Sequence, residues 1–249
     1  MIIAFICIVL IFNTMETISI HRPKIVVIGS CNTDMVVKAN RLPVPGETIL
    51  GGTFYMNPGG KGANQAIAAA RLGAEVTFIS KIGYDLFGLQ ALEIYRSEKI
   101  NTEYIFTDQK SPSGVALISV DSFGENSIIV APGASRSLSI EDINKAEEKI
   151  KEADIILMQL EIPIDTVEYA ATIACKYGKK VILNPAPASS LSNSFLMNVH
   201  TILPNRIEAE MLSGIKVMNI ESAHRAAQAI GEKGIENVVI TLGKDGAYV

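Results

Sequence analysis

A glycine-rich stretch at residues 57–65 contains the residue types best suited to holding a ligand. It reads Asn-Pro-Gly-Gly-Lys-Gly-Ala-Asn-Gln, and the small apolar residues from Ala63 onward have the i, i+3, i+4, i+7 spacing of a helix. The first turn of a helix has backbone N–H groups without partners, and here it also carries Lys61 and Asn64. A turn that only caps a buried helix is the alternative. Lys61 and Asn64 favour a binding site for an anion or for a ligand rich in hydroxyl groups.

Two common phosphate-binding loops do not fit this stretch. A Walker A loop has a glycine five residues before its Gly-Lys pair and a Ser or Thr directly after the lysine, whereas Tyr55 and Gly62 occupy these positions. The G-x-G-x-x-G pattern of dinucleotide-binding loops is also absent from it. The class of ligand therefore has to be inferred from the residues that surround the loop.

Polar residues also follow two expected strands. Residues 24–29 form a β-branched run typical of a strand buried on both faces, and Asn32 and Asp34 come shortly after it. Glu161 follows the expected strand 154–159. Because ligands of open α/β sheets bind at the carboxyl ends of the strands, we expect these side chains on one rim of the sheet. Ordinary turn chemistry is the alternative for Asn32 and Asp34, and an exposed surface position is the alternative for Glu161.

A third polar group lies in the second half of the chain. Asn205 and Glu208 have Asn-x-x-Glu spacing at the expected start of a helix, where a helix cap is the alternative to a ligand contact. The turn at residues 242–246 follows the expected strand 237–241. Taken alone, this turn indicates no function.

The elements that position these residues alternate between strand and helix over most of the chain. This alternation predicts an α/β fold with a doubly wound, mostly parallel sheet flanked by helices. Two stretches break the alternation and predict a small separate β-sheet, with strands drawn from about 35–56 and 114–131. One helix is expected over 139–152. The strands expected in the first β-rich stretch are 35–37, 47–50 and 52–55.

The composition is that of one large domain with a small-molecule ligand. The 249 residues are 48% hydrophobic, with a net charge of −4 and a pI of about 5.5. Without a run of Lys or Arg, this charge gives no electrostatic signature for nucleic acid or for an anionic membrane. We assign residues 24–249 to the domain and residues 1–23 to an N-terminal apolar extension that is not part of the fold.

The N-terminal residues and the cysteines bear on location. Residues 1–12 are almost wholly apolar, but they are too few to span a bilayer and lack a basic flank, which makes a signal peptide the weaker alternative. Cys7, Cys31 and Cys175 have no spacing typical of disulfides or zinc sites. A reducing compartment fits best, so the expected location is the cytoplasm, with the nucleus as a second location.

Seven motifs run through the chain in the order of one family. They read NTD at 32–34, PGE at 45–47, GGKGANQA at 59–66, MQLEIP at 158–163, LNPAPA at 183–188, LPNRIEAE at 203–210 and ITLGKDGA at 240–247. Together they resemble the ribokinase-like carbohydrate kinase family, of PfkB type, from about Lys24 to Val249. The resemblance implies a doubly wound α/β domain with a small β-sheet lid, which covers a sugar and joins two copies into a homodimer.

The resemblance also implies a reaction and the residues that would serve it. The reaction is ATP-dependent phosphorylation of D-ribose to D-ribose 5-phosphate, with Mg²⁺ and K⁺ as cofactors. Glu208 would hold Mg²⁺ indirectly, through metal-bound water. The residues that would bind the sugar are Asn32, Thr33, Asp34, Gly59, Gly60, Lys61, Gly62, Ala63, Asn64 and Glu161. The residues that would bind ATP are Asn205, Thr241, Leu242, Gly243, Lys244, Asp245 and Gly246.

One motif of the family is absent. In the family, Gly-Ala-Gly-Asp supplies the base for the attacking hydroxyl and an anion hole for the phosphoryl group, and it occurs nowhere in these 249 residues. Its expected position, like that of the K⁺ site, lies beyond Val249, and Asp245 lies in a strand turn that does not suit the role. We therefore expect a C-terminally truncated chain that is inactive by itself. Two alternatives stay open: a kinase of the same family for another sugar or a nucleoside, and a non-catalytic truncated sugar-binding isoform.

Overall fold

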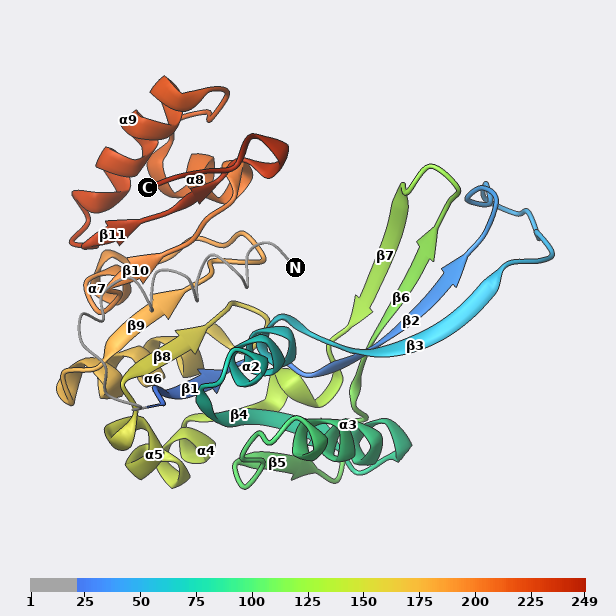
Figure 1. The fold of residues 1–249 in the computed structure, drawn as a ribbon, viewed down its shortest axis with the longest axis horizontal. Helices are drawn as coiled ribbons and strands as arrows, with labels where there is room; N and C mark the ends of the chain where they lie inside the picture. Colours follow the sequence, from blue (N-terminus) through green and yellow to red (C-terminus); the bar gives the residue numbers. More distant parts are fainter. Residues whose placement is uncertain (1–21) are drawn as a thin grey trace.

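The computed structural model describes residues 22–249, which form a layered body with a projecting arm (Figure 1). The N-terminal apolar extension expected at residues 1–23 therefore lies outside the described residues, apart from its last two. The body is an α/β domain, and the arm is a separate four-stranded sheet. The fold class expected from the sequence is confirmed in both parts.

A parallel sheet forms the centre of the body. In the described part of the chain its strands are, in spatial order, β11 (Asn237–Val238), β10 (Thr201–Ile202), β9 (Lys180–Leu183), β8 (Ile155–Met158), β1 (Lys24–Ile28), β4 (Glu75–Gly83) and β5 (Ile105–Asp108). From β1 the chain first adds β4 and β5 on one side and later adds β8 to β11 on the other. The carboxyl ends of β1 and β8 therefore lie at the switch point, where doubly wound sheets bind ligands.

Helices cover both faces of this sheet. Side chains of β1 show why both faces are apolar, because Ile25 and Val27 point to one face and Val26 and Ile28 to the other. The first face packs against α2 (Lys61–Arg71) and α3 (Leu86–Ser97). The second face packs against α4 (Ile140–Lys145), α5 (Glu147–Glu152), α6 (Ile164–Lys176), α7 (Asn193–Leu196), α8 (Arg206–Ser213) and α9 (Ile220–Gly231).

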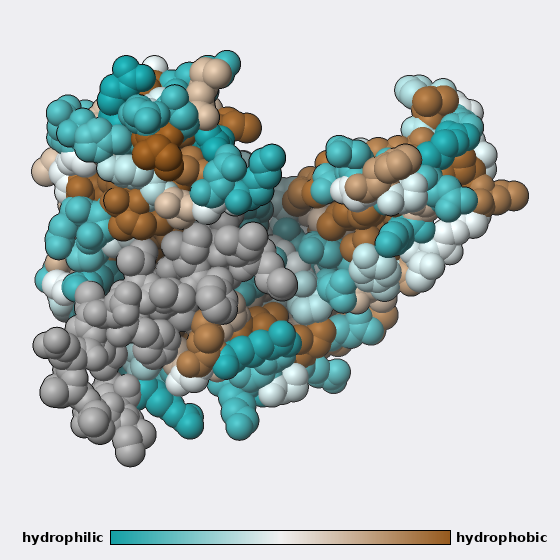
Figure 2. All heavy atoms as spheres, turned by 45° about the horizontal axis from the view of Figure 1, so that its top comes forward, coloured by the Kyte–Doolittle hydropathy of each residue, from teal (hydrophilic) through white to brown (hydrophobic). Residues whose placement is uncertain are grey.

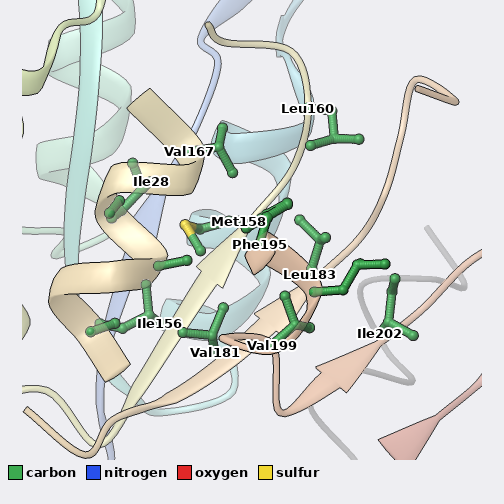
Figure 3. Packing of buried hydrophobic residues seen from close by; sticks show 14 of the residues in the cluster. Ile28, Ile156, Met158, Leu160, Val167, Val181, Leu183, Phe195, Val199 and Ile202 are labelled. Atoms are coloured by element: carbon green, nitrogen blue, oxygen red, sulfur yellow. The ribbon is translucent and has the colours of Figure 1, made fainter. Parts of the chain in front are cut away.

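The core on the second face supports the rim at which β8 ends. Figure 3 shows Ile156 and Met158 of β8 gathered with Val181 of β9 and Val167 of α6. All four side chains are fully buried. Burial of one such side chain stabilises a fold by roughly 1.5–3 kcal/mol. The end of β8 is therefore a firmly held position for the polar residues that follow it.

The arm is a separate sheet, which we call the lid. Its strands are, in spatial order, β3 (Thr53–Gly59), β2 (Asn32–Lys38), β6 (Gly114–Val120) and β7 (Asn126–Ala131). β2 begins a few residues after β1, and β3 ends directly before α2, so the base of the lid adjoins the rim of the body (Figure 1). The small β-sheet expected from the two β-rich stretches is confirmed.

The strand expected at 47–50 is wrong. In the structure, residues 39–52 contain no strand and form the loop between β2 and β3. There the Glu47 carboxylate accepts a hydrogen bond from the Val44 N–H at 3.1 Å and pairs with Arg41. A proline and a glycine come directly before Glu47, and both favour a turn over a strand.

Three shorter elements also differ from the expectation. The helix expected over 139–152 is divided at Ala146 into α4 and α5. β5 was not expected from the sequence, and the strand expected at 237–241 is divided into β11 and β12 (Ile240–Thr241). β12 pairs with β13 (Ala247–Tyr248) across the short 3-10 helix η2 (Gly243–Asp245), and a second such helix, η1 (Gly133–Ser137), follows β7. Among the described residues, every helix is too short or too polar to cross a membrane.

Candidate functional site

The glycine-rich stretch forms the start of α2 and lies directly on the end of β1. Gly60 precedes the helix at a φ of 87°, a conformation that favours glycine. The Ala63 N–H donates to the Ser30 carbonyl at 3.0 Å. A Cβ atom on Gly62 would lie 2.7 Å from the Gly29 carbonyl carbon, so only glycine allows this approach. The N-terminus of α2 is therefore fixed at the switch point of the sheet.

Glu161 lies just beyond β8, and its carboxylate is bonded to the start of α2. Oε2 accepts from the Lys61 N–H at 2.9 Å and from the Ser30 hydroxyl, while Oε1 accepts from the Lys61 ammonium at 2.6 Å. Burial acts to raise the pKa of this carboxyl, but the hydrogen bonds and the charge of Lys61 outweigh it and hold the pKa below its ordinary value. Glu161 is therefore an anion anchored at the rim, and the alternative of an exposed surface group does not apply.

Asp34 lies on β2, at the base of the lid. A Cβ atom on Gly59 would lie 2.0 Å from Asp34 Oδ1, so the carboxylate rests against the glycine backbone. Burial and the charge of Glu161 raise the pKa of Asp34 above its ordinary 3.8, against the opposing charge of Lys61. Within residues 22–249 no hydrogen bond to this carboxylate contributes to the shift. Asp34 therefore keeps acceptor positions for a ligand beside the Glu161 and Lys61 pair.

The other sugar-side residues differ in where their side chains lie. Asn64 is exposed at the start of α2 and is accessible to a ligand. Asn32 is buried, and its Oδ1 packs against Gly114 without a hydrogen-bond partner among the described residues. Thr33 lies on the opposite face of the lid from Asp34, where it lines a cavity of about 440 Å³ between the lid and α3. The structure thus brings the side chains of Asp34, Lys61 and Glu161 together. Thr33 points to the other face of the lid, and the buried Asn32 side chain lies on the Asp34 face against Gly114.

Asn205 and Glu208 form a capping box at the start of α8. Asn205 Oδ1 accepts from the Glu208 N–H at 2.9 Å, and Glu208 Oε2 accepts from the Asn205 N–H at 2.8 Å. The cap that the spacing allowed is therefore present, and it occupies only one of the two Glu208 oxygens. Burial raises the pKa of Glu208, and the charge of Lys61 opposes this effect. The charge of Lys61 therefore lowers the pKa of carboxylates on the expected sugar side, Asp34 and Glu161, and on the expected nucleotide side, Glu208.

The loop after β12 is joined to the start of α8. Thr241 forms a β-bridge with Asn205. The Arg206 guanidinium donates to the Leu242 carbonyl at 3.3 Å and to the Asp245 carboxylate at 2.9 Å. The residues expected to bind a nucleotide therefore lie together. Asp245 is thus held in an ion pair with Arg206.

The donor set decides whether a metal ion fits. Within residues 22–249 no cluster of three or more His, Cys, Asp or Glu side chains could hold a metal by itself. Mg²⁺ does not need such a cluster, because it is usually held by one or two carboxylates together with phosphate oxygens and water. Glu208, with one oxygen outside its capping box, fits this form of binding.

Two residues of the site were not predicted from the sequence. Ser30 contacts Glu161, and Arg206 joins α8 to the loop after β12. The signal that could have identified Ser30 is its position directly after Gly29, on the rim to which Asp34 also belongs. Arg206 lies within the motif LPNRIEAE, but that motif does not indicate its partners in the loop after β12, which lie 36 and 39 residues further along the chain.

Known proteins resemble this chain over nearly all of its described length. The model of the pfkB family carbohydrate kinases matches residues 22–249. Ribokinase from Haemophilus influenzae is 46% identical over 228 residues, which cover 92% of this chain and 74% of that protein. Deoxyribokinase from Salmonella typhi is 39% identical over 224 residues, which cover 90% of this chain and 73% of that protein.

The three-dimensional structure is shared as well. The structure of Arabidopsis thaliana ribokinase complexed with ribose and ATP matches with a TM-score of 0.81 at 31% identity, covering 91% of this chain and 74% of that chain. By sequence and by structure, the chain belongs to the pfkB family of carbohydrate kinases.

Proposed function

We propose that the protein phosphorylates D-ribose with ATP to form D-ribose 5-phosphate. One observation carries the proposal: the carboxylates of Asp34 and Glu161 meet at the N-terminus of α2, beside the ammonium of Lys61. The hydroxyl groups of a sugar need such paired acceptors and donors. Similarity to the ribokinase of Haemophilus influenzae, and to the Arabidopsis thaliana ribokinase solved with ribose and ATP, supports ribose as the sugar.

The sugar-side groups bind and orient the substrate. Asp34 and the Oε1 atom of Glu161 accept hydrogen bonds from sugar hydroxyls, while Lys61 and Asn64 donate hydrogen bonds to sugar oxygens. Asn32, Thr33 and the glycines of the loop contribute backbone groups to sugar binding. Gly59 and Gly60 have no side chains, which lets the sugar come close to this backbone. The base for the attacking hydroxyl is assigned by the family resemblance to a Gly-Ala-Gly-Asp motif and to none of these carboxylates.

The nucleotide is proposed to lie along the start of α8 and the loop from Thr241 to Gly246. The β-bridge between Asn205 and Thr241 supports this placement, because it holds the two segments side by side so that one ligand can contact both. Glu208 would hold Mg²⁺ through water, with the phosphates as further ligands, and the bound ion would neutralise charge on the transferring phosphoryl group. We propose K⁺ as a second cofactor because the family resemblance implies it.

Two measurements test this function. Titration calorimetry of the 249-residue chain measures ribose binding, with xylose and arabinose as sugars that differ in the orientation of their hydroxyls. Formation of ribose 5-phosphate from radiolabelled ATP, with and without Mg²⁺ and K⁺, tests phosphoryl transfer in a longer chain that also carries the Gly-Ala-Gly-Asp motif. We expect ribose to bind at least about tenfold more tightly than either epimer, since a misplaced hydroxyl leaves a polar group of the site unpaired. Equal or absent binding of the three sugars would contradict the proposal.

Deoxyribose is the second candidate substrate. The 39% identity to deoxyribokinase from Salmonella typhi favours its inclusion, because this value is not far below the 46% identity to ribokinase from Haemophilus influenzae. The same calorimetric series with 2-deoxyribose distinguishes the two sugars. Adding adenosine to the calorimetric series tests a nucleoside substrate. The ATP assay tests a purely sugar-binding role.

Ribose binding should weaken on acidification at a higher pH than an ordinary aspartate would cause. The pKa of Asp34 is raised above 3.8 by burial and by the charge of Glu161, so Asp34 takes up a proton early as the pH falls. The protonated group is no longer a charged acceptor, and affinity present above the raised pKa is lost as the pH drops through it. Calorimetry between pH 7 and pH 4 measures the effect. Asp34→Asn is the control that should lack it, and constant affinity in the unmodified chain over this range would contradict it.

The lid is proposed to join two copies of the chain. Exposed apolar side chains gather on the projecting lid, as Figure 2 shows. By strand register Ile128 lies on the same face as Asp34 and is 51% exposed, whereas Ile129 lies on the opposite face and is 68% exposed. Exposed apolar patches of this kind mark interfaces between proteins.

Charges on the two lid faces test the homodimer. Ile128→Glu and Ile129→Glu place one carboxylate on each face in turn, and a charge buried without a partner strongly disfavours association. We expect the variant on the contacting face to be monomeric and the other to remain dimeric, as measured by light scattering after gel filtration. A monomeric unmodified chain, or a dimer that survives both substitutions, would count against the lid as the interface.

The proposed location is the cytoplasm, with the nucleus as a second location. Support comes from the cysteines, since Cys31 and Cys175 are both free within the described residues. Burial raises the pKa of the Cys31 thiol to about 11, which keeps it unreactive. Fractionation of cells that express the tagged protein tests the location, and recovery from the medium would instead support secretion.

A further inference from the structure

Ser30 lies at the end of β1 and contacts two parts of the site at once. It is only 1% exposed. Its carbonyl accepts a hydrogen bond from the Ala63 N–H of α2 at 3.0 Å, and its hydroxyl donates to Oε2 of Glu161. Glu161 is 131 residues further along the chain, so this contact is a product of the tertiary fold. One small side chain therefore joins the end of β1 to the carboxylate beyond β8.

The hydroxyl of Ser30 determines which oxygen of Glu161 remains for a ligand. Oε2 receives two donors, the Ser30 hydroxyl and the Lys61 N–H, whereas Oε1 receives only the Lys61 ammonium. A carboxylate oxygen has two lone pairs, so Oε2 is saturated and Oε1 keeps one position. The terminal torsion of a glutamate is broad, and a donor on one side restricts it.

We propose that Ser30 is a positioning residue for sugar binding. Its hydroxyl fixes the Glu161 carboxylate in the orientation that presents Oε1 to a sugar hydroxyl. Ser30 acts through Glu161, because its own side chain is buried and its hydroxyl proton is already used. This inference rests on the proposed ribose-binding function, and it adds the residue that orients a sugar acceptor.

A second buried serine provides a matched control. The Ser80 hydroxyl donates to the Gly29 carbonyl at 2.7 Å, and Ser80 is fully buried. Ser30→Ala and Ser80→Ala each remove one buried hydroxyl donor near the end of β1, but only the first removes a donor to Glu161. We expect the ribose Kd, measured by calorimetry, to rise about tenfold in Ser30→Ala, as for loss of a hydrogen bond to a charged group. The Kd should change less than about twofold in Ser80→Ala, while both variants lose thermal stability.

A pH series separates positioning from a general loss of structure. The Ser30 hydroxyl is one of the groups that lower the pKa of Glu161, although burial and Lys61 act on it more strongly. Without that hydroxyl Glu161 takes up a proton more readily. Ribose affinity should therefore fall at a higher pH in Ser30→Ala than in the unmodified chain. Ser80→Ala should follow the unmodified chain.

Two further variants make the result decisive. Ser30→Cys keeps the shape but has a weak donor, so its Kd should lie between those of the unmodified chain and Ser30→Ala. It also replaces Ser30→Ala in every measurement if the alanine variant does not unfold cooperatively. In a Glu161→Gln background, Ser30→Ala should weaken ribose binding less than about twofold, because its target is already altered.

The outcomes distinguish the inference from the proposed function. If the unmodified chain binds ribose and the Ser30 variants bind with the same Kd and the same pH dependence, the positioning role is wrong and the proposed function stands. If Ser80→Ala weakens binding as much as Ser30→Ala, the effect is structural and the role is also wrong. If the unmodified chain does not bind ribose, the proposed function fails and the inference fails with it.

Discussion

Replacing Asp34 by asparagine should weaken ribose binding about a hundredfold. A hydrogen bond to a charged group contributes roughly 1.5–3 kcal/mol, and a carboxylate that accepts two sugar hydroxyls can therefore account for a factor of this size. The asparagine amide has nearly the same shape, but it presents donor hydrogens where the sugar also presents donors. Titration calorimetry with ribose measures the change directly.

The stability of the same variant provides an internal control. Burial and the nearby Glu161 charge disfavour ionised Asp34 in the folded chain, as its raised pKa indicates. Asp34→Asn should therefore unfold at an equal or higher temperature while it binds ribose poorly. Glu125→Gln removes the same charge from an exposed position of the lid and should leave ribose affinity unchanged. Ribose binding by Asp34→Asn within about threefold of the unmodified chain would remove Asp34 from the site.

Replacing Gly62 by alanine should lower the free energy of unfolding. The new Cβ atom would lie 2.7 to 2.8 Å from backbone atoms of Gly29 and Ser30, none of which can move like the end of a flexible side chain. Overpacking of this kind costs about 1–3 kcal/mol, and the gain in helix propensity offsets roughly 1 kcal/mol of it. We expect a net loss of up to about 2 kcal/mol in the free energy of unfolding, measured by urea denaturation.

A helical glycine at open surface is the matched control for Gly62. Gly231 ends α9, and a Cβ atom there would meet no atom within 4 Å. Gly231→Ala should therefore leave stability unchanged or raise it by up to about 1 kcal/mol. Ribose binding should weaken only in Gly62→Ala, since displacement of α2 moves the Lys61 N–H away from Glu161. Equal stability of both variants would show that α2 can shift without cost.

The sheet and the lid were predictable because their signals are local. The β-branched run of β1 requires a strand covered on both faces, and the glycines and small residues at the start of α2 require close packing. Short elements gave weaker signals. β5 is four residues long and lies at the edge of the sheet, and in the tip loop of the lid a turn replaced the expected strand at 47–50.

The candidate site was predictable in its composition but not in its contacts. The first lid strand was expected to begin at residue 35, whereas β2 begins at Asn32. In a strand, neighbouring side chains point to opposite faces, and this alternation separates Thr33 from Asp34. The burial of Asn32 depends on Gly114, which becomes its neighbour only when β6 pairs with β2. Such contacts follow from strand pairing, which no single segment specifies.

The contacts that build the sugar site give it a particular place in folding. The bond between Ser30 and Glu161 joins residues 131 positions apart, and the bonds between Lys61 and Glu161 span 100 positions. These bonds require β1 and β8 to be paired already. The sugar site around Glu161 therefore forms only after contacts of long sequence separation have formed. A ligand that binds only this completed arrangement stabilises the folded chain, by about 2.7 kcal/mol at a concentration one hundred times its Kd. The substrate would thus act as a folding aid, and ribose in the growth medium should raise the yield of folded protein for destabilised variants that keep the sugar site, such as Ser80→Ala.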